Sequence, residues 1–69
     1  MERSKSYILL QLYDRLRTGG VIRITECCGA FKISVATFRR YIAFLRGYFS
    51  EMCGKELVYE PNMTAYCLR

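Results

Sequence analysis

The sequence predicts a mainly α-helical domain of three helices followed by a small β-hairpin. Apolar residues recur at helical spacing over about residues 5–17 and again over about 35–52, with room for one brief helix at about 25–31. Residues 55–68 hold two short runs of alternating character around a turn that contains the only proline. Because 69 residues suffice for one modest core, we expect residues 1–69 to form a single domain.

The first helix is expected from about residue 5 to about residue 17. Its apolar face comprises Ile8, Leu9, Leu12, Tyr13 and Leu16. Ser4 or Ser6 offers an N-cap, and the run Thr18-Gly19-Gly20 ends the helix. Residues 21–24 are rich in β-branched side chains, which favours a short strand or an extended link before the next helix.

The second and third helices are expected to be joined by a short turn. Thr25 offers an N-cap for a second helix over about 25–31, with Glu26 near the positive end of the helix dipole. After Lys32-Ile33, Ser34 offers the N-cap of a longer third helix over about 35–52. Two helices in this order, the second with an arginine-rich outer face, predict a helix-turn-helix.

The third helix has three kinds of face. Its core stripe comprises Phe38, Ile42, Leu45 and Phe49. The opposite face holds Ala36, Arg39, Arg40, Ala43 and Arg46. A third group, Tyr41, Phe44 and Tyr48, makes the apolar arc wider than one core seam needs. We expect these three to pack within the domain; the alternative is an exposed group that forms a homodimer surface.

The order helix, strand, helix, turn, helix, hairpin is that of a winged helix-turn-helix, with three helices plus a wing. The hairpin at about 55–68 is the wing, and its tip, Pro61-Asn62-Met63-Thr64, carries no cation. We therefore expect any contact of the tip with a minor groove to be weak.

Charge favours a polyanionic partner. Eleven Lys and Arg oppose six Asp and Glu, for a formal net charge of +5, which suits nucleic acid or an anionic membrane. Eight of the eleven are arginine, whose planar fork matches phosphates and guanine edges, so we favour nucleic acid. The alternative is a small basic domain whose charges serve only solubility.

The stretches YILLQLYDRL, ISVATFRRYIAFLR and YCL resemble the N-terminal winged helix-turn-helix domain of bacterial transcription regulators of the DeoR-like and WYL-domain type. The resemblance covers nearly the whole chain. It implies a sequence-specific reader of double-stranded DNA in the bacterial cytoplasm, which precedes a ligand-sensing or dimerising domain. Ser34, Thr37 and Arg40 fall at the family positions that face DNA. Lys32 stands where the family has a turn glycine, and Tyr41 where it has an acid.

The residue order suits entry into a major groove. Slim side chains lead the third helix, so its backbone can approach the bases; they are Ser34, Val35, Ala36 and Thr37. The two hydroxyls and the free helix amides can hold a phosphate. Arg39 and Arg40 project about 100° apart, and we favour Arg40 for a base and Arg39 for a phosphate or a second base. For Arg46, a phosphate contact and plain solvation remain equal alternatives.

Catalysis, metal binding and membrane insertion find little support. The chain has no histidine, no nucleophile motif and no glycine-rich phosphate loop, so we expect neither enzyme activity nor a cofactor. Vicinal Cys27 and Cys28 with distant Cys53 and Cys67 suit a zinc site poorly, and we expect four reduced thiols. No signal peptide or long apolar run is evident, which predicts a cytoplasmic protein without a membrane partner. The rival function is a winged-helix protein-interaction module that does not bind DNA.

Overall fold

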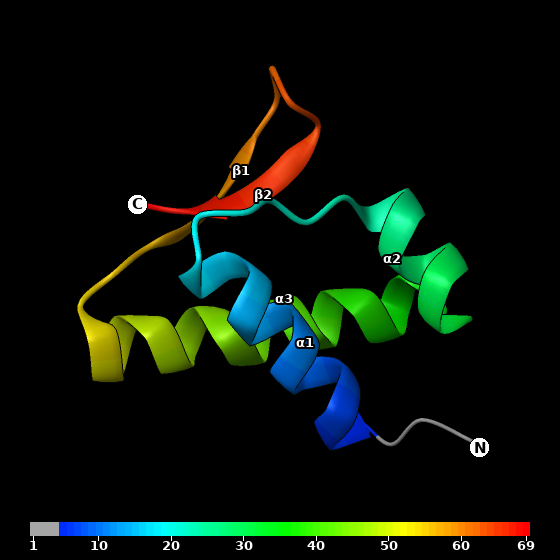
Figure 1. The fold of residues 1–69 in the computed structure, drawn as a ribbon, viewed down its shortest axis with the longest axis horizontal. Coiled ribbons are helices and arrows are strands. Elements are labelled where there is room, and N and C mark those ends of the chain that lie inside the picture. Colours follow the sequence, from blue (N-terminus) through cyan, green and yellow to red (C-terminus); the bar gives the residue numbers. More distant parts are fainter. Residues whose placement is uncertain (1–4) are drawn as a thin grey trace.

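The computed structural model describes residues 5–69, and it confirms the predicted winged helix-turn-helix fold (Figure 1). In chain order the elements are α1 (Lys5–Arg17), α2 (Ile24–Phe31), α3 (Val35–Tyr48), the π-helix η1 (Phe49–Cys53), β1 (Leu57–Glu60) and β2 (Ala65–Leu68). α1 crosses α3, α2 packs near the N-terminal end of α3, and the hairpin lies against the C-terminal end of α1. The core lies where these elements meet.

The first helix presents its expected apolar face to the core. Ile8, Leu12 and Leu16 are buried, and Leu9 and Tyr13 are half-buried beside them. The helix begins at Lys5, so Ser6 lies inside it and does not cap it, while Ser4 lies outside the described residues. At the other end, the Thr18 hydroxyl donates to the Asp14 carbonyl at 3.0 Å, which satisfies a terminal helix carbonyl.

The short strand or extended link expected at 21–24 is an extended link with one bridge residue, Ile22. Ile22 exchanges two backbone hydrogen bonds with Tyr66, at 2.9 and 2.8 Å, and its side chain is fully buried. The chain then enters α2 at Ile24, so Thr25 lies within the helix and the predicted cap at Thr25 is wrong. Arg23 occupies the N-cap in an extended conformation without a side-chain capping bond. Tertiary pairing of Ile22 with β2 therefore sets the start of α2.

The turn between α2 and α3 uses a left-handed residue that is not glycine. Lys32 has φ 54° and ψ 48°, and its amide donates to the Cys28 carbonyl. The next amide, that of Ile33, donates to the same carbonyl at 3.2 Å. Lys32 thus adopts the backbone that favours glycine, at a strain of about 1 kcal/mol or more. The turn nevertheless stays short, with only Lys32 and Ile33 between α2 and the N-cap of α3.

One cluster of side chains holds the elements together. The buried apolar residues are Ile8, Leu12, Leu16, Ile22, Cys27, Phe38, Tyr41, Ile42, Leu45, Phe49, Leu57 and Ala65. The predicted core stripe of the third helix supplies four of them, including Phe38 and Phe49, the two largest side chains that are fully buried. Because α3 contributes more of this core than any other element, the position of its outer face follows from the packing of its inner face.

The C-terminal half forms the wing. α3 continues into the π-helix, which ends where Gly54 takes a left-handed conformation with φ 62°. β1 and β2 pair antiparallel from Leu57↔Leu68 to Glu60↔Ala65. Backbone bonds of 2.9 and 2.8 Å between Glu56 and Arg69 extend the ladder by one further pair.

Replacing Lys32 with glycine should stabilise the fold. Lys32→Gly relieves the left-handed strain, which outweighs the added freedom of the unfolded chain, so the free energy of unfolding should rise by about 0.5–1 kcal/mol. The matched control is Lys55→Gly, at an exposed lysine without a positive φ, which should lower it by about 0.5–1 kcal/mol. Urea unfolding compares the variants, and equal losses for both would contradict the account of the turn.

Candidate nucleic-acid interface

The N-terminus of α3 is built by a side-chain cap. Ser34 is extended, with φ −79° and ψ 163°, and its Oγ accepts from the Thr37 amide at 3.1 Å. The predicted N-cap at Ser34 is therefore confirmed. The Ser34 hydroxyl also donates to Thr37 Oγ1 at 3.0 Å, which leaves the Thr37 proton directed elsewhere. Ser34 thus holds the helix start in place, and Thr37 is the hydroxyl with a donor still available.

The first turn of α3 exposes backbone amides. A helix leaves its first N–H groups without intrahelical acceptors, and Ser34 satisfies only that of Thr37. The amides of Val35 and Ala36 therefore remain, and both residues are solvent-exposed, Val35 by 47%. Such amides, together with the positive end of the helix dipole, suit an anionic oxygen.

The outer face of α3 has a bare strip, by which we mean a row of residues with no side chain larger than a methyl group, between two arginines. Ala36, Ala43 and Gly47 follow one another along this face, and a Cβ added at Gly47 would meet nothing within 4 Å. Arg39 and Arg40 flank this strip on its two sides. Both are exposed, and neither forms a hydrogen bond or ion pair with another residue of the 5–69 region. Arg40 lies on the α1 side of the strip and Arg39 on the hairpin side.

Arg46 has a structural contact that its sequence position did not indicate. Its Nε donates to the Leu57 carbonyl at 3.1 Å, which ties the end of α3 to the start of β1. The Arg46 side chain is nevertheless solvent-exposed, so the bond adds a structural contact and leaves both alternatives, a phosphate contact and solvation, open. Arg46 lies nine residues beyond Thr37, which is about 14 Å along the helix axis. It is thus separate from the cluster at the N-terminus of α3.

The structure adds two cations that sequence reasoning missed. Lys55 and Arg69 line the same open hollow as Arg46, at the end of α3 beside the hairpin. The backbone pair between Glu56 and Arg69 brings these distant positions together, and Glu60 forms an ion pair with Arg69. The alternating hairpin pattern was the one signal that pointed to this proximity, because it implies that residues near 55 and 69 face each other.

Two other arginines are engaged within the domain. Arg17 forms an ion pair with Asp14 at 3.0 Å. Arg23 lies 4.0 Å from the Glu26 carboxylate, and its Nε donates to the Met63 carbonyl in the wing tip at 3.3 Å. The wing tip carries no charge of its own, yet this contact places one cation beside it.

The third-helix aromatics divide into two groups. Tyr41 is 6% exposed and belongs to the core, which confirms the favoured expectation that it packs within the domain and excludes it from the alternative, a dimer surface. Phe44 is 63% exposed, which departs from the favoured expectation that it packs within the domain. Tyr48 is 41% exposed, but its ring contacts Tyr13 of α1 and Phe49 edge to face, so it packs within the domain on one side. The angular position of each residue around the helix axis explains the division, because Tyr41 lies closest of the three to the core stripe.

The cysteines lie apart from this interface. Cys27 fills the buried position of α2, and burial raises the pKa of its thiol, so it stays protonated at neutral pH. All four cysteines are free thiols. Within residues 5–69, no three His, Cys, Asp or Glu side chains come together as metal ligands, and no helix is both long and apolar enough to span a membrane.

Comparisons with protein-family models, with curated proteins and with solved structures gave no match to this chain.

Removing the cap at Ser34 should destabilise α3. Ser34→Ala leaves the Thr37 amide without its acceptor, and the free energy of unfolding should fall by about 1 kcal/mol. Ser34→Asp retains a capping oxygen and should stay within about 0.5 kcal/mol of the parent chain. Ser50→Ala, at an exposed serine outside the cap, is the control, and urea unfolding measures all three. A neutral Ser34→Ala would rule out the capping role.

Proposed function

We propose that this chain is a sequence-specific DNA-binding domain in which α3 enters the major groove. The observation that carries the proposal is the arrangement at the start of α3, where open amides and the Thr37 hydroxyl lie beside two exposed, unpaired arginines on a bare helix face. A surface helix of a merely soluble domain needs no such order. A recognition helix needs all of it, since the backbone must approach base edges while cations meet phosphates.

Each residue at the start of α3 would make a different contact with the DNA. The amides of Val35 and Ala36 and the Thr37 hydroxyl bind one phosphate and set the register of the helix. Arg40 reaches a guanine edge with its two parallel N–H donors, and Arg39 binds a phosphate on the hairpin side or a second base. Arg46, Lys55 and Arg69 add a second set of DNA-backbone contacts near the other end of α3, about 14 Å further along its axis. Ser34 acts by holding the first turn in place.

The setting we propose is a bacterial transcription regulator in the cytoplasm, of the DeoR-like or WYL-domain type. It rests on the resemblance carried by ISVATFRRYIAFLR and on the winged helix-turn-helix fold. In such a regulator the chain would read double-stranded DNA without a cofactor and without catalysis. A dimerising domain would bring two copies to two half-sites about one helical turn apart.

A second candidate is a protein-interaction module. One observation favours it: Leu10, Phe44 and Tyr48 are exposed together along α1 and α3. Salt dependence separates the two functions, because each neutralised phosphate releases counterions whereas apolar docking releases none.

Arg40 should carry base preference. In oligonucleotides selected for binding, Arg40→Ala should relax the preference at one base pair by about 1–3 kcal/mol and leave the other positions unchanged. Lys55→Ala is the control: it should weaken binding to all sequences alike and reduce the salt slope by about 1. If Arg40→Ala weakened binding to all sequences alike, Arg40 would contact a phosphate and not a base.

Ser34→Asp separates folding from binding. The aspartate keeps the cap but places a negative charge where a phosphate would lie, so the folded variant should bind duplex DNA at least about tenfold more weakly. Fluorescence anisotropy at two salt concentrations measures it. If the parent chain binds no duplex at low salt, DNA binding is excluded and the protein-interaction module remains.

A further inference from the structure

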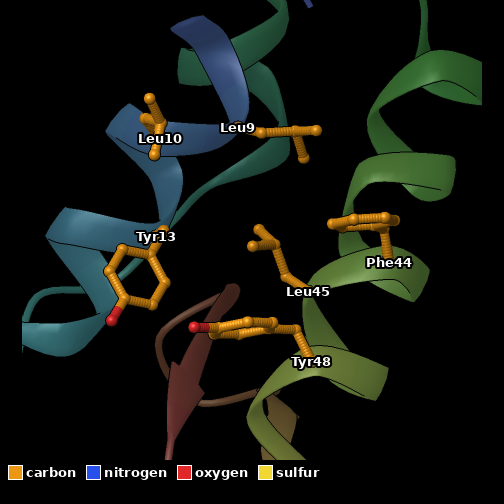
Figure 2. Close-up of a pocket in the computed structure, with 6 residues that line it drawn as sticks. All are labelled: Leu9, Leu10, Tyr13, Phe44, Leu45 and Tyr48. Carbon is orange, nitrogen blue, oxygen red and sulfur yellow. The ribbon is translucent and has the colours of Figure 1, made fainter. Parts of the chain in front are cut away.

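An open apolar groove runs between α1 and α3, away from the bare strip of α3. It has a volume of about 270 Å³, and its lining residues are Leu9, Leu10, Tyr13, Phe44, Leu45 and Tyr48. Figure 2 shows Leu9 and Tyr13 from α1 and Phe44, Leu45 and Tyr48 from α3 lying around the space between the two helices. Leu10 and Phe44 are the most exposed of them, at 64% and 63%. Apolar side chains gathered in this way on a small domain indicate a contact surface.

The groove has a firm aromatic wall. The rings of Tyr13 and Phe49 stack at 5.3 Å between centroids, and Tyr48 meets Tyr13 edge to face at 5.7 Å. Phe49 is buried in the core, which fixes the position of the two tyrosines. Tyr13 and Tyr48 therefore have little freedom to move, and a docked partner would cost little side-chain entropy at these two residues.

The charges along α3 are arranged for a second copy of the chain. Arg40 lies one turn before Phe44, and Glu51 lies about one turn after Tyr48. Within the described chain neither charge has an ion-pair partner. A copy of the helix in antiparallel orientation, centred near residue 46, places each Arg40 opposite a Glu51 and each Phe44 opposite a Tyr48. A parallel copy would instead oppose like charges, which is destabilising.

We propose that the groove is the interface of a homodimer in which two α3 helices pack antiparallel across a two-fold axis. The Phe44 of each copy enters the groove of the other, between Tyr13 and Tyr48. Two Arg40–Glu51 pairs close the rims. The arrangement is isologous, so one surface serves both copies and the assembly closes as a dimer.

The dimer does not rest on the proposed DNA binding. The Arg40 guanidinium of each copy can pair either with Glu51 of the other copy or with a DNA base, so the two interactions compete. The self-association is therefore measured without DNA.

Sedimentation equilibrium of the 69-residue chain tests the interface. The parent chain should be a reversible dimer. Phe44→Ser should weaken the dimer at least about tenfold. Val35→Ser, at a similarly exposed apolar residue of α3 outside the groove, should leave it unchanged. Circular dichroism should show the same helix content for all three, because both substituted side chains are exposed. A chain that stays monomeric up to about 1 mM would overturn the proposal and leave the groove to another partner.

Charge reversal tests the orientation independently of any apolar substitution. Arg40→Glu and Glu51→Arg should each weaken the dimer about tenfold, because each variant opposes like charges at both rims. The double variant restores two opposite-charge pairs and should return to within about threefold of the parent dissociation constant. A double variant no tighter than either single variant would overturn the antiparallel arrangement.

Discussion

One helix must hold the core together and also leave its opposite face bare. α3 buries Phe38, Tyr41, Ile42 and Leu45, so its rotation about its own axis is determined by packing. Its outer strip of small residues and its two flanking arginines are presented as a consequence of that packing. The same rotation leaves Phe44 and Tyr48 at the edge of the core, where α1 does not fully cover them. Both the proposed DNA surface and the proposed dimer groove follow from this one constraint.

Some arginines of the domain have an interaction partner on the same chain and others have none. Arg17, Arg23 and Arg69 each have a carboxylate partner on the same chain, and Arg46 is bonded to a backbone carbonyl. Arg39 and Arg40, at the start of α3, have no such partner among the described residues, and neither has Arg15 in α1. Of these three arginines, Arg39 and Arg40 lie side by side next to an open helix N-terminus. The net charge alone could not make this distinction, because it counts every arginine equally.

Much of the fold was predictable from local patterns, and the exceptions have tertiary causes. The core stripes of α1 and α3 and the cap at Ser34 follow from periodicity and capping chemistry, which need no knowledge of distant residues. The start of α2 was misplaced because the pairing of Ile22 with Tyr66 sets it across 44 residues of chain. The bond from Arg46 to Leu57 and the grouping of Lys55 with Arg69 likewise depend on how the hairpin returns to α3. At the candidate site, the residues at the start of α3 were predictable. The hydrogen-bond and ion-pair partners of each hydroxyl and guanidinium were not.

The most direct test of the central claim is to map the amides that respond to DNA. Nitrogen-15 NMR spectra of the Phe44→Ser chain, in which self-association is weakened, would be recorded with and without a selected duplex at low salt. The account predicts the largest shift changes at Val35, Ala36, Thr37 and Arg40, and small changes on the groove side of α1, including Leu10. Changes concentrated on the groove side, with the start of α3 unaffected, would contradict it.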